Sequence, residues 1–367
     1  MNQANLMDFK EKRERVCAYL RGKKENALVL RRRDSFAWAT FGGDNKIFRS
    51  GDLGAGLLVF TEQDTYLFAY SMDADRIMEE ELEGLPVEQV TVLWNQGTLE
   101  EAVGQKLGDV NVISDYPADG WSCRFEELLQ LRLPYTLWEQ KRYEQVGALC
   151  DRLFYEVAEE LRPGMTEQQA ASILARHFEE EKMVPKVLLV GSDERITKYR
   201  HPLPSDKVME HTVLLHVASD KYGMHGNITR MLCFGEIPGN LERDYELLNL
   251  CQASVMSLLK PGVPYKELLN IRRQILREAG KESEWNLHFP GATAGYYVGS
   301  SEPILGEARV EDTRCYDWFM TVTGAKVEEL SMASPQGGKV LSAAGWWPGK
   351  EYQVKDYKCC LPVIMCR

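Results

Sequence analysis

The sequence LRPGM at residues 161–165 returns as LKPGV at residues 259–263. Each copy lies between two stretches whose apolar residues have helical spacing, and the second stretches read QQAASILARHFEEE and YKELLNIRRQILREAG. Because Pro followed by Gly interrupts a helix, each copy marks a turn between two helices. Strand-like sequence follows at 184–234 and again at 286–331. The matching flanks predict two similar αα-ββ halves, which would pack about a pseudo-twofold axis with a site between their sheets.

The helix before the first copy is long and amphipathic. Its apolar residues recur every three or four positions on one face, at Val146, Leu149, Leu153, Val157 and Leu161. After the turn, TEQQ at residues 166–169 has the form of a capping box. In this motif the Thr166 hydroxyl accepts from the third helical amide while the Gln169 side chain reaches back, so a helix is expected to begin here.

The first part of the chain has a different pattern. Between residues 8 and 130, runs of branched and aromatic residues such as GAGLLVFTEQDTYLFAY alternate with helical runs such as TLEEAVGQKLGD. This alternation predicts a compact α/β domain. With 367 residues, two domains are expected, and we place them at 1–133 and 134–367. The predicted fold class is therefore α/β (α+β), with helices and strands mixed in both domains.

Composition excludes several partners. The chain carries 44 Lys and Arg against 55 Asp and Glu, a net charge of −11, which argues against a nucleic-acid partner. No apolar run approaches the roughly 18 residues needed to cross a bilayer, so no membrane partner is expected. The N-terminus MNQANLMDFKEKRERV has no apolar signal core, and the nine cysteines include no CxxC pair. A cytoplasmic protein with reduced thiols is expected.

Several stretches resemble one known family. The helix pairs, the turn RPGMTEQQAA, the sequence HTVLLHVASDKYGMHGNITRML at residues 211–232 and the closing WWPGKEY resemble the pita-bread family, which includes creatinase, aminopeptidase P, prolidase and methionine aminopeptidase. The resemblance implies a creatinase-type domain over residues 8–130 and a pita-bread domain over 135–367. It also implies a homodimer and places residues 211–232 in a β-hairpin.

In the metallopeptidase members of this family, two metal ions are held by five side chains. The resemblance places two aspartates at His216 and Asn227, a histidine at Ala292, and a glutamate near Asp317, which aligns poorly. Only the fifth ligand is retained, as Glu328. The resemblance therefore implies an emptied dinuclear centre and a protein without a cofactor. The alternative is a single transition metal, for which the candidate ligands are His201, His216, His225, His288 and Glu328.

The resemblance also assigns roles to individual residues. His201 matches a histidine that points into the cleft and would act as the acid/base, since imidazole titrates near neutrality. Glu328 matches a creatinase glutamate that anchors a cationic group of a small-molecule substrate. The alternative for Glu328 is an ion pair with Lys326 or with an arginine, because a buried carboxylate needs a positive partner.

Other residues are expected to line the substrate. His216, His225 and Asn227 would form the polar lining of the emptied site. The small residues from Gly291 to Gly295 allow a close backbone approach, and Tyr296 or Tyr297 could reach the ligand with a hydroxyl. In a homodimer, the resemblance implies that Phe48 and Arg49 enter the partner's cleft, where Arg49 could clamp a carboxylate.

Three functions follow as hypotheses. The first is a metal-independent, creatinase-like enzyme acting on a C–N bond of a small amino-acid-like or amidine-like substrate. The second is a non-catalytic pseudo-peptidase that binds a peptide or a partner protein. The third is an Xaa-Pro-type aminopeptidase or dipeptidase with an altered mononuclear metal site. Because His216 and Asn227 are still polar, and burying unpaired polar groups costs about 1 to 3 kcal/mol each, we expect an active or ligand-binding cleft.

Overall fold

The computed structural model describes residues 3–298 and 306–367. Its contacts divide the chain into two compact units, Met1–Glu139 and Gln140–Arg367. The N-terminal stretch MNQANLMDFKEKRERV quoted above includes two residues, Met1 and Asn2, that lie outside the described ranges. Within those ranges, none of the helices is both long enough and apolar enough to span a bilayer.

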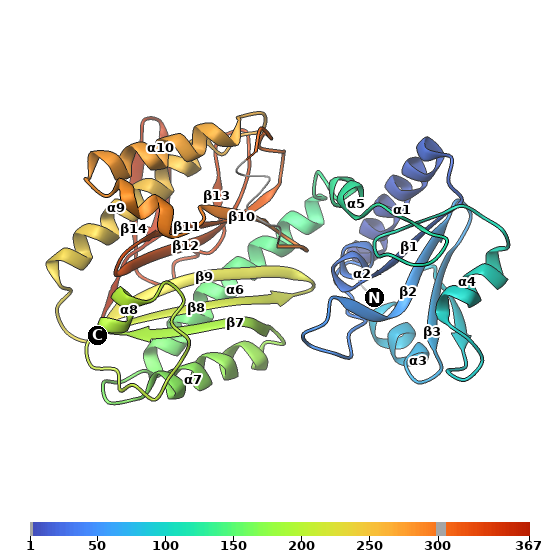
Figure 1. The fold of residues 1–367 in the computed structure, drawn as a ribbon, viewed down its shortest axis with the longest axis horizontal. Helices are drawn as coiled ribbons and strands as arrows, with labels where there is room; N and C mark the ends of the chain where they lie inside the picture. The colour runs from blue at the N-terminus through green and yellow to red at the C-terminus, as the bar shows by residue number, and fades with distance from the viewer. Residues whose placement is uncertain (1–2, 299–305) are drawn as a thin grey trace. The chain divides into compact units, whose positions relative to one another are not determined.

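The first unit, blue to green in Figure 1, is built on one six-stranded sheet in the order β4-β3-β2-β1-β5-β6. Its strands are β1 (Ala27–Arg32), β2 (Leu53–Thr61), β3 (Thr65–Tyr70), β4 (Glu88–Val92), β5 (Val112–Ser114) and β6 (Ser122–Cys123). Its helices are α1 (Gln3–Lys23), α2 (Arg33–Ala39), α3 (Ala74–Arg76), the π-helix η1 (Ile77–Glu81), α4 (Leu99–Leu107) and α5 (Phe125–Leu131). Helix α4 begins with a capping box between Thr98 and Glu101.

A charged cluster fixes the start of α2 in this unit. Asp34 accepts a hydrogen bond from Arg132 at 2.9 Å and another from the Nε of Arg32 at 2.8 Å. Burial opposes the charge of Asp34, but the two guanidinium groups outweigh burial and lower its pKa. The carboxylate is therefore held ionised between the buried Arg132 and the partly buried Arg32.

The second unit carries the duplicated halves. Its helices are α6 (Leu137–Glu160), α7 (Glu167–Glu180), α8 (Glu194–Lys198), α9 (Gly239–Leu258), α10 (Tyr265–Glu278) and the 3₁₀-helix η2 (Glu282–Leu287). Its strands are β7 (Val184–Ser192), β8 (Thr212–Lys221), β9 (Met224–Cys233), β10 (Gly291–Ala294), β11 (Cys315–Val322), β12 (Ala325–Met332), β13 (Lys339–Val340), β14 (Gly349–Val354), β15 (Tyr357–Pro362) and β16 (Met365–Cys366).

The two Pro-Gly turns have the same local structure, which confirms the predicted duplication. Gly164 has a φ of +92° and donates to the carbonyl of Met209, while Gly262 has a φ of +86° and donates to the carbonyl of Val310. Glycine adopts this left-handed conformation at little cost. The predicted capping box is also confirmed, because Thr166 accepts from the Gln169 amide at 3.1 Å and the Gln169 side chain accepts in return.

The strand order of the main sheet, β10-β11-β12-β9-β8-β7, shows how the halves meet. Each half contributes one hairpin, β8–β9 or β11–β12, and the hairpins join where β12 runs antiparallel to β9. Each hairpin closes through a two-residue turn ending in glycine, at Gly223 or Gly324. The predicted pita-bread architecture with two αα-ββ halves is confirmed.

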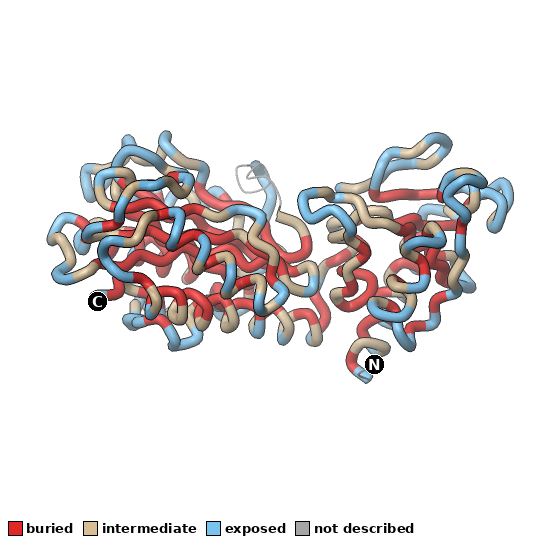
Figure 2. The backbone as a smooth tube through the Cα atoms, turned by 90° about the horizontal axis from the view of Figure 1, so that it is seen from below, coloured by how far each residue is buried: buried red, intermediate tan, exposed pale blue. Residues whose placement is uncertain are grey.

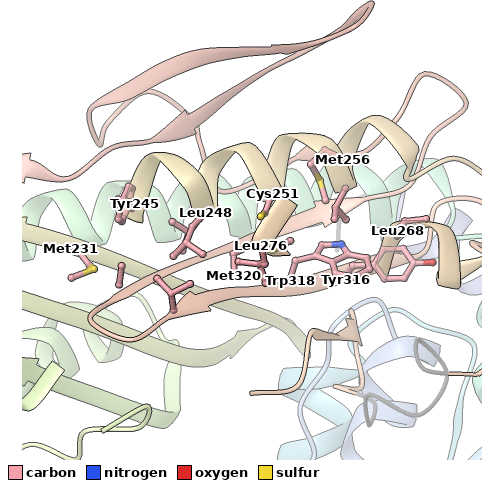
Figure 3. Packing of buried hydrophobic residues seen from close by; sticks show 14 of the residues in the cluster. Met231, Tyr245, Leu248, Cys251, Met256, Leu268, Leu276, Tyr316, Trp318 and Met320 are labelled. Carbon is pink, nitrogen blue, oxygen red and sulfur yellow. The ribbon is translucent and has the colours of Figure 1, made fainter. Parts of the chain in front are cut away.

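The two faces of this sheet differ. Figure 3 shows Tyr316, Trp318 and Met320 of β11 lying beneath Leu248, Cys251 and Met256 of α9. Figure 2 shows that buried residues run through the interior of this unit, with exposed residues at its outer loops. Because side chains alternate along a strand, the intervening residues Asp317, Phe319 and Thr321 lie on the opposite face. That opposite face carries the polar residues described next.

Candidate functional site

A row of buried polar side chains crosses the junction between the two halves. His216 on β8 is the register partner of Thr229 on β9, and Thr229 is in turn the partner of Glu328 on β12. Directly opposed residues share one face of a sheet, so these three side chains lie together. Asn227 and Asp317 extend the row by one step along β9 and β11, and all five residues are buried.

Glu328 is the centre of the hydrogen-bond network. Its Oε2 atom accepts from Lys326 Nζ at 2.7 Å and from Thr229 Oγ1 at 2.8 Å, and it lies 3.1 Å from His216 Nδ1. Burial favours the neutral acid, but His216 and Lys326 outweigh it and hold the pKa of Glu328 well below its usual range. Glu328 is therefore a carboxylate with one oxygen fully engaged.

The pKa of Asp317 is shifted in the opposite direction to that of Glu328. Its Oδ2 atom accepts from Asn227 Nδ2 at 2.9 Å, and its carboxyl group also hydrogen-bonds to Glu328. Burial and the charge of Glu328 raise the pKa of Asp317 well above its usual range. Asp317 Oδ1 and Glu328 Oε1 make no hydrogen bond to a described donor, which agrees with one proton held between them. The pair therefore contains one acid and one base.

His201 and His288 form a second group beside this row. His201 lies between α8 and β8, His288 follows η2, and their Nε2 atoms are 3.2 Å apart. Burial, followed by the charge of Lys326, lowers the pKa of His201. Burial lowers the pKa of His288 to about 4. Both imidazoles are therefore neutral at neutral pH, and His201 is solvent-exposed.

The remaining predicted residues lie around or apart from the row. His225, on β9, pairs with Asp220, and its amide donates to the Gly295 carbonyl at 2.9 Å. Tyr296 is buried just after β10, near the end of the small-residue stretch. Phe48 and Arg49 belong to the other unit, between α2 and β2, where Phe48 is 76% exposed. Their role in a partner's cleft stays a prediction.

The structure shows the surroundings of two residues that the sequence singled out. Asp317, which aligned poorly with the family glutamate, lies inside the row beside Asn227. Glu328 forms the ion pair with Lys326 that was the alternative to a substrate anchor. The alternation of Tyr316, Trp318 and Met320 along β11 was the signal that could have placed Asp317 on the polar face.

The residues present do not fit the two-metal cluster of the family. The five corresponding positions are His216, Asn227, Ala292, Asp317 and Glu328, of which Ala292 offers no ligand atom and pairs in register with Asp317. The Lys326 ammonium already occupies a coordination direction of Glu328. Across the described ranges, no group of three or more His, Cys, Asp or Glu side chains is arranged to hold a metal ion.

Comparisons with known proteins agree with the fold. Residues 141–314 match Metallopeptidase family M24. Over 220 residues the chain is 24% identical to "Probable dipeptidase PepE" of Mycobacterium tuberculosis strain H37Rv, a match covering 57% of this chain and 58% of that relative. It is 21% identical over 318 residues to the "Xaa-Pro dipeptidase" of Pyrococcus furiosus, covering 79% of this chain and 88% of the relative.

Solved structures show the same architecture. The prolidase of Pyrococcus horikoshii OT3 superposes with a TM-score of 0.73 at 17% identity, over 90% of this chain and 98% of the other. The X-Pro aminopeptidase of Thermotoga maritima MSB8 gives a TM-score of 0.72 at 17% identity, over 90% and 97% of the two chains. At this identity the likeness establishes the fold alone.

The match to a metallopeptidase family overturns one expectation. The sequence suggested a protein that takes no cofactor, but the family matched over residues 141–314 is defined by metal chemistry. The expectation was wrong because it took the loss of four of the five family ligands as grounds for a protein without a cofactor. A metal held by other side chains was a separate possibility.

Proposed function

Because the chain belongs to the pita-bread family of creatinase, aminopeptidase P and prolidase, we propose that it is a peptidase-type hydrolase. It would cleave the C–N bond of a small peptide, with a dipeptide ending in proline as the substrate class. The names of the relatives favour this dipeptidase alternative over the creatinase-like reaction. The match spans only 58% of the mycobacterial relative, so the activity is a proposal.

The observation that carries the proposal is the carboxyl pair of Asp317 and Glu328. Hydrolysis of an amide adds hydroxide to the carbonyl carbon and a proton to the leaving nitrogen, so it needs a base and an acid. Glu328 is the ionised partner and Asp317 holds the proton. Two carboxyl groups whose pKa values are pushed apart by their environment are typical of acid/base catalysis.

The residues of this site would have the following roles in the reaction. Glu328 Oε1 accepts the proton of the attacking water, while Lys326 and Thr229 keep Oε2 charged. Asp317 Oδ1 donates its proton to the leaving nitrogen, and the amide of Asn227 fixes the orientation of that carboxyl group.

The same residues argue against a purely binding role. Asn227 Oδ1 is buried without a hydrogen bond to any described donor, at a cost of about 1 to 3 kcal/mol, and the carboxyl groups of Asp317 and Glu328 are buried beside it. A site kept only for its shape would gain stability by replacing these groups with apolar side chains. Retained buried polar groups support a cleft that acts on a ligand.

A dipeptide panel tests the proposal. Purified full-length protein is assayed with Ala-Pro, Leu-Pro and Ala-Ala, with and without Mn²⁺, Co²⁺ or Zn²⁺. We expect hydrolysis of at least one Xaa-Pro dipeptide, and a drop in kcat of at least about 100-fold for Asp317→Asn and Glu328→Gln. Circular dichroism checks that both variants fold. Absence of hydrolysis by the unmodified protein under every metal condition would reject the proposal.

We also propose a cytoplasmic homodimer as the working form. This proposal extends the sequence resemblance, and light scattering of the purified protein tests it directly. A mass near twice 41.9 kDa is expected. A monomer would remove the idea that Phe48 and Arg49 serve a partner's cleft.

A further inference from the structure

We propose that His201 and His288 together bind one transition-metal ion, of the class of Zn²⁺, Cu²⁺ or Ni²⁺, at a position distinct from the five family ligand positions. The proposal goes beyond the hydrolytic function and does not depend on it. It rests on the spacing of two ring nitrogens, on the hydrogen bond of one ring, and on the surroundings of both.

The spacing of the two nitrogens suits a single ion. The Nε2 atoms of His201 and His288 are 3.2 Å apart, although the residues are 87 positions apart in the chain. Two imidazole nitrogens bound to one tetrahedral zinc at about 2.0 to 2.1 Å are separated by roughly 3.3 to 3.4 Å. The two rings therefore need only a small adjustment to hold the same ion.

The hydrogen bonding of His288 presents the correct nitrogen. Its Nδ1 lies 2.8 Å from the carbonyl oxygen of Phe289, which can only accept, so Nδ1 carries the proton and donates. Nε2 of His288 then carries a lone pair, which faces His201. A backbone carbonyl that fixes the distal N–H in this way is a common orienting partner of metal-bound histidine.

Without metal, two facing lone pairs would repel, so one nitrogen must bear a proton. His201 Nε2 then donates to His288 Nε2, which accounts for the 3.2 Å contact. On metal binding, the His201 proton moves to Nδ1 through solvent, because this residue is exposed. The Nε2 lone pair of His201 thereby becomes available to the metal, and the imidazole keeps one proton and stays neutral.

The surroundings hold one ring and leave the ion accessible. The rings of Phe289 and Phe319 lie with centroids 4.6 Å and 5.6 Å from that of His288, which restricts its rotation. Lys326 and Glu328, which form an ion pair at 2.7 Å, act on both rings, and Lys326 has the larger effect, so the field at the pair opposes a cation and weakens its binding. Since no third described His, Cys, Asp or Glu joins the pair, water or substrate would complete the coordination.

The ligand type sets the metal class. Imidazole suits zinc, copper and nickel, whereas magnesium and calcium prefer oxygen donors. An ion with open positions is also the arrangement of catalytic rather than structural zinc sites. We therefore expect weaker binding than in a closed four-ligand site, with exchange on chelator treatment.

Calorimetric titration of the chelator-treated full chain with Zn²⁺ and electron paramagnetic resonance with Cu²⁺ test the site. One equivalent is expected to bind, with nitrogen hyperfine structure from two imidazoles. His201→Ala and His288→Ala should each weaken binding at least 10-fold. His211→Ala is the matched control, because its Nδ1 donates to the Phe234 carbonyl at 2.7 Å, and its removal should leave metal binding unchanged.

Three results would overturn the assignment. They are no binding by the unmodified chain, unchanged binding in both the His201 and His288 variants, and loss of binding in His216→Ala but not in those two. The last result would place the ion at the family position. Because these measurements report binding directly, a failed dipeptide assay leaves them unaffected, and a failed titration leaves the dipeptide assay unaffected.

Discussion

Glu328 and Thr229 are register partners across the junction of the two duplicated halves, and the Thr229 hydroxyl donates to the Glu328 carboxylate at 2.8 Å. A hydroxyl contributed by the first half thus helps to stabilise the charge of a carboxylate in the second. The network around Glu328 therefore couples the stability of the sheet to the protonation of the site.

Thr229→Val removes this hydrogen bond while keeping the shape of the side chain. Because hydrogen bonds to charged groups contribute about 1.5 to 3 kcal/mol, we expect the free energy of unfolding of the second unit to fall by about that amount. Urea unfolding of the full chain, followed by circular dichroism, measures the change. Thr229→Ser keeps the donor and should lose less than half as much.

Lys326→Met leaves the Glu328 carboxylate without its cation. Breaking a buried ion pair by removing one partner costs about 3 to 5 kcal/mol, because the remaining charge is uncompensated. In the double variant Lys326→Met with Glu328→Gln, that charge is gone, so the loss of unfolding free energy should be smaller than for Lys326→Met alone. A double variant less stable than the single one would contradict the pairing.

Asp317→Asn should change stability by less than about 1 kcal/mol. Asp317 already carries a proton at neutral pH, so the neutral amide replaces a neutral acid of nearly the same shape. Glu328→Gln, in contrast, removes an ionised group with three donors around Oε2 and should cost about 3 kcal/mol. Equal losses in chemical denaturation would show that the proton is placed wrongly within the pair.

Asp34→Asn tests the pH dependence of the first unit. The folded-state pKa of Asp34 lies below its unfolded value of about 3.9, so its ion pairs stabilise the fold fully above that value. The contribution is lost as pH falls through the folded-state pKa. We expect the variant to lose about 3 kcal/mol of unfolding free energy at pH 7 and clearly less at pH 3. A constant difference between the two pH values would reject this role.

Two helical glycines give a matched comparison. A Cβ added at Gly147 in α6 would lie 2.4 Å from the Leu341 carbonyl oxygen, whereas one added at Gly104 in α4 meets nothing within 4 Å. Gly147→Ala should therefore destabilise the protein by about 1 to 3 kcal/mol through forced backbone movement. Gly104→Ala should stabilise it by about 0.5 to 1 kcal/mol, because alanine loses less entropy in a helix. Thermal unfolding of both variants shows whether each substitution raises or lowers the stability of the protein.

Local patterns in the sequence predicted much of the fold. The turns at Gly164 and Gly262 and the capping box at Thr166 depend on neighbouring residues, so their signals are contained in short stretches. The contact between His201 and His288 could not be predicted in this way, because two distant segments bring the rings together. A count of residues along the chain aligned Asp317 poorly, and only the alternation of side chains along β11 indicates which face of the strand it occupies.

The junction of β9 and β12 also bears on how a chain of this kind could arise. A polypeptide containing a single half would end in an uncovered strand whose amide and carbonyl groups seek a partner, and a second copy of the same polypeptide could supply it in the antiparallel direction. Fusing two such copies covers both strand edges inside one molecule. Each copy is then free to change its inward-facing side chains independently, which a symmetric assembly of identical subunits does not permit.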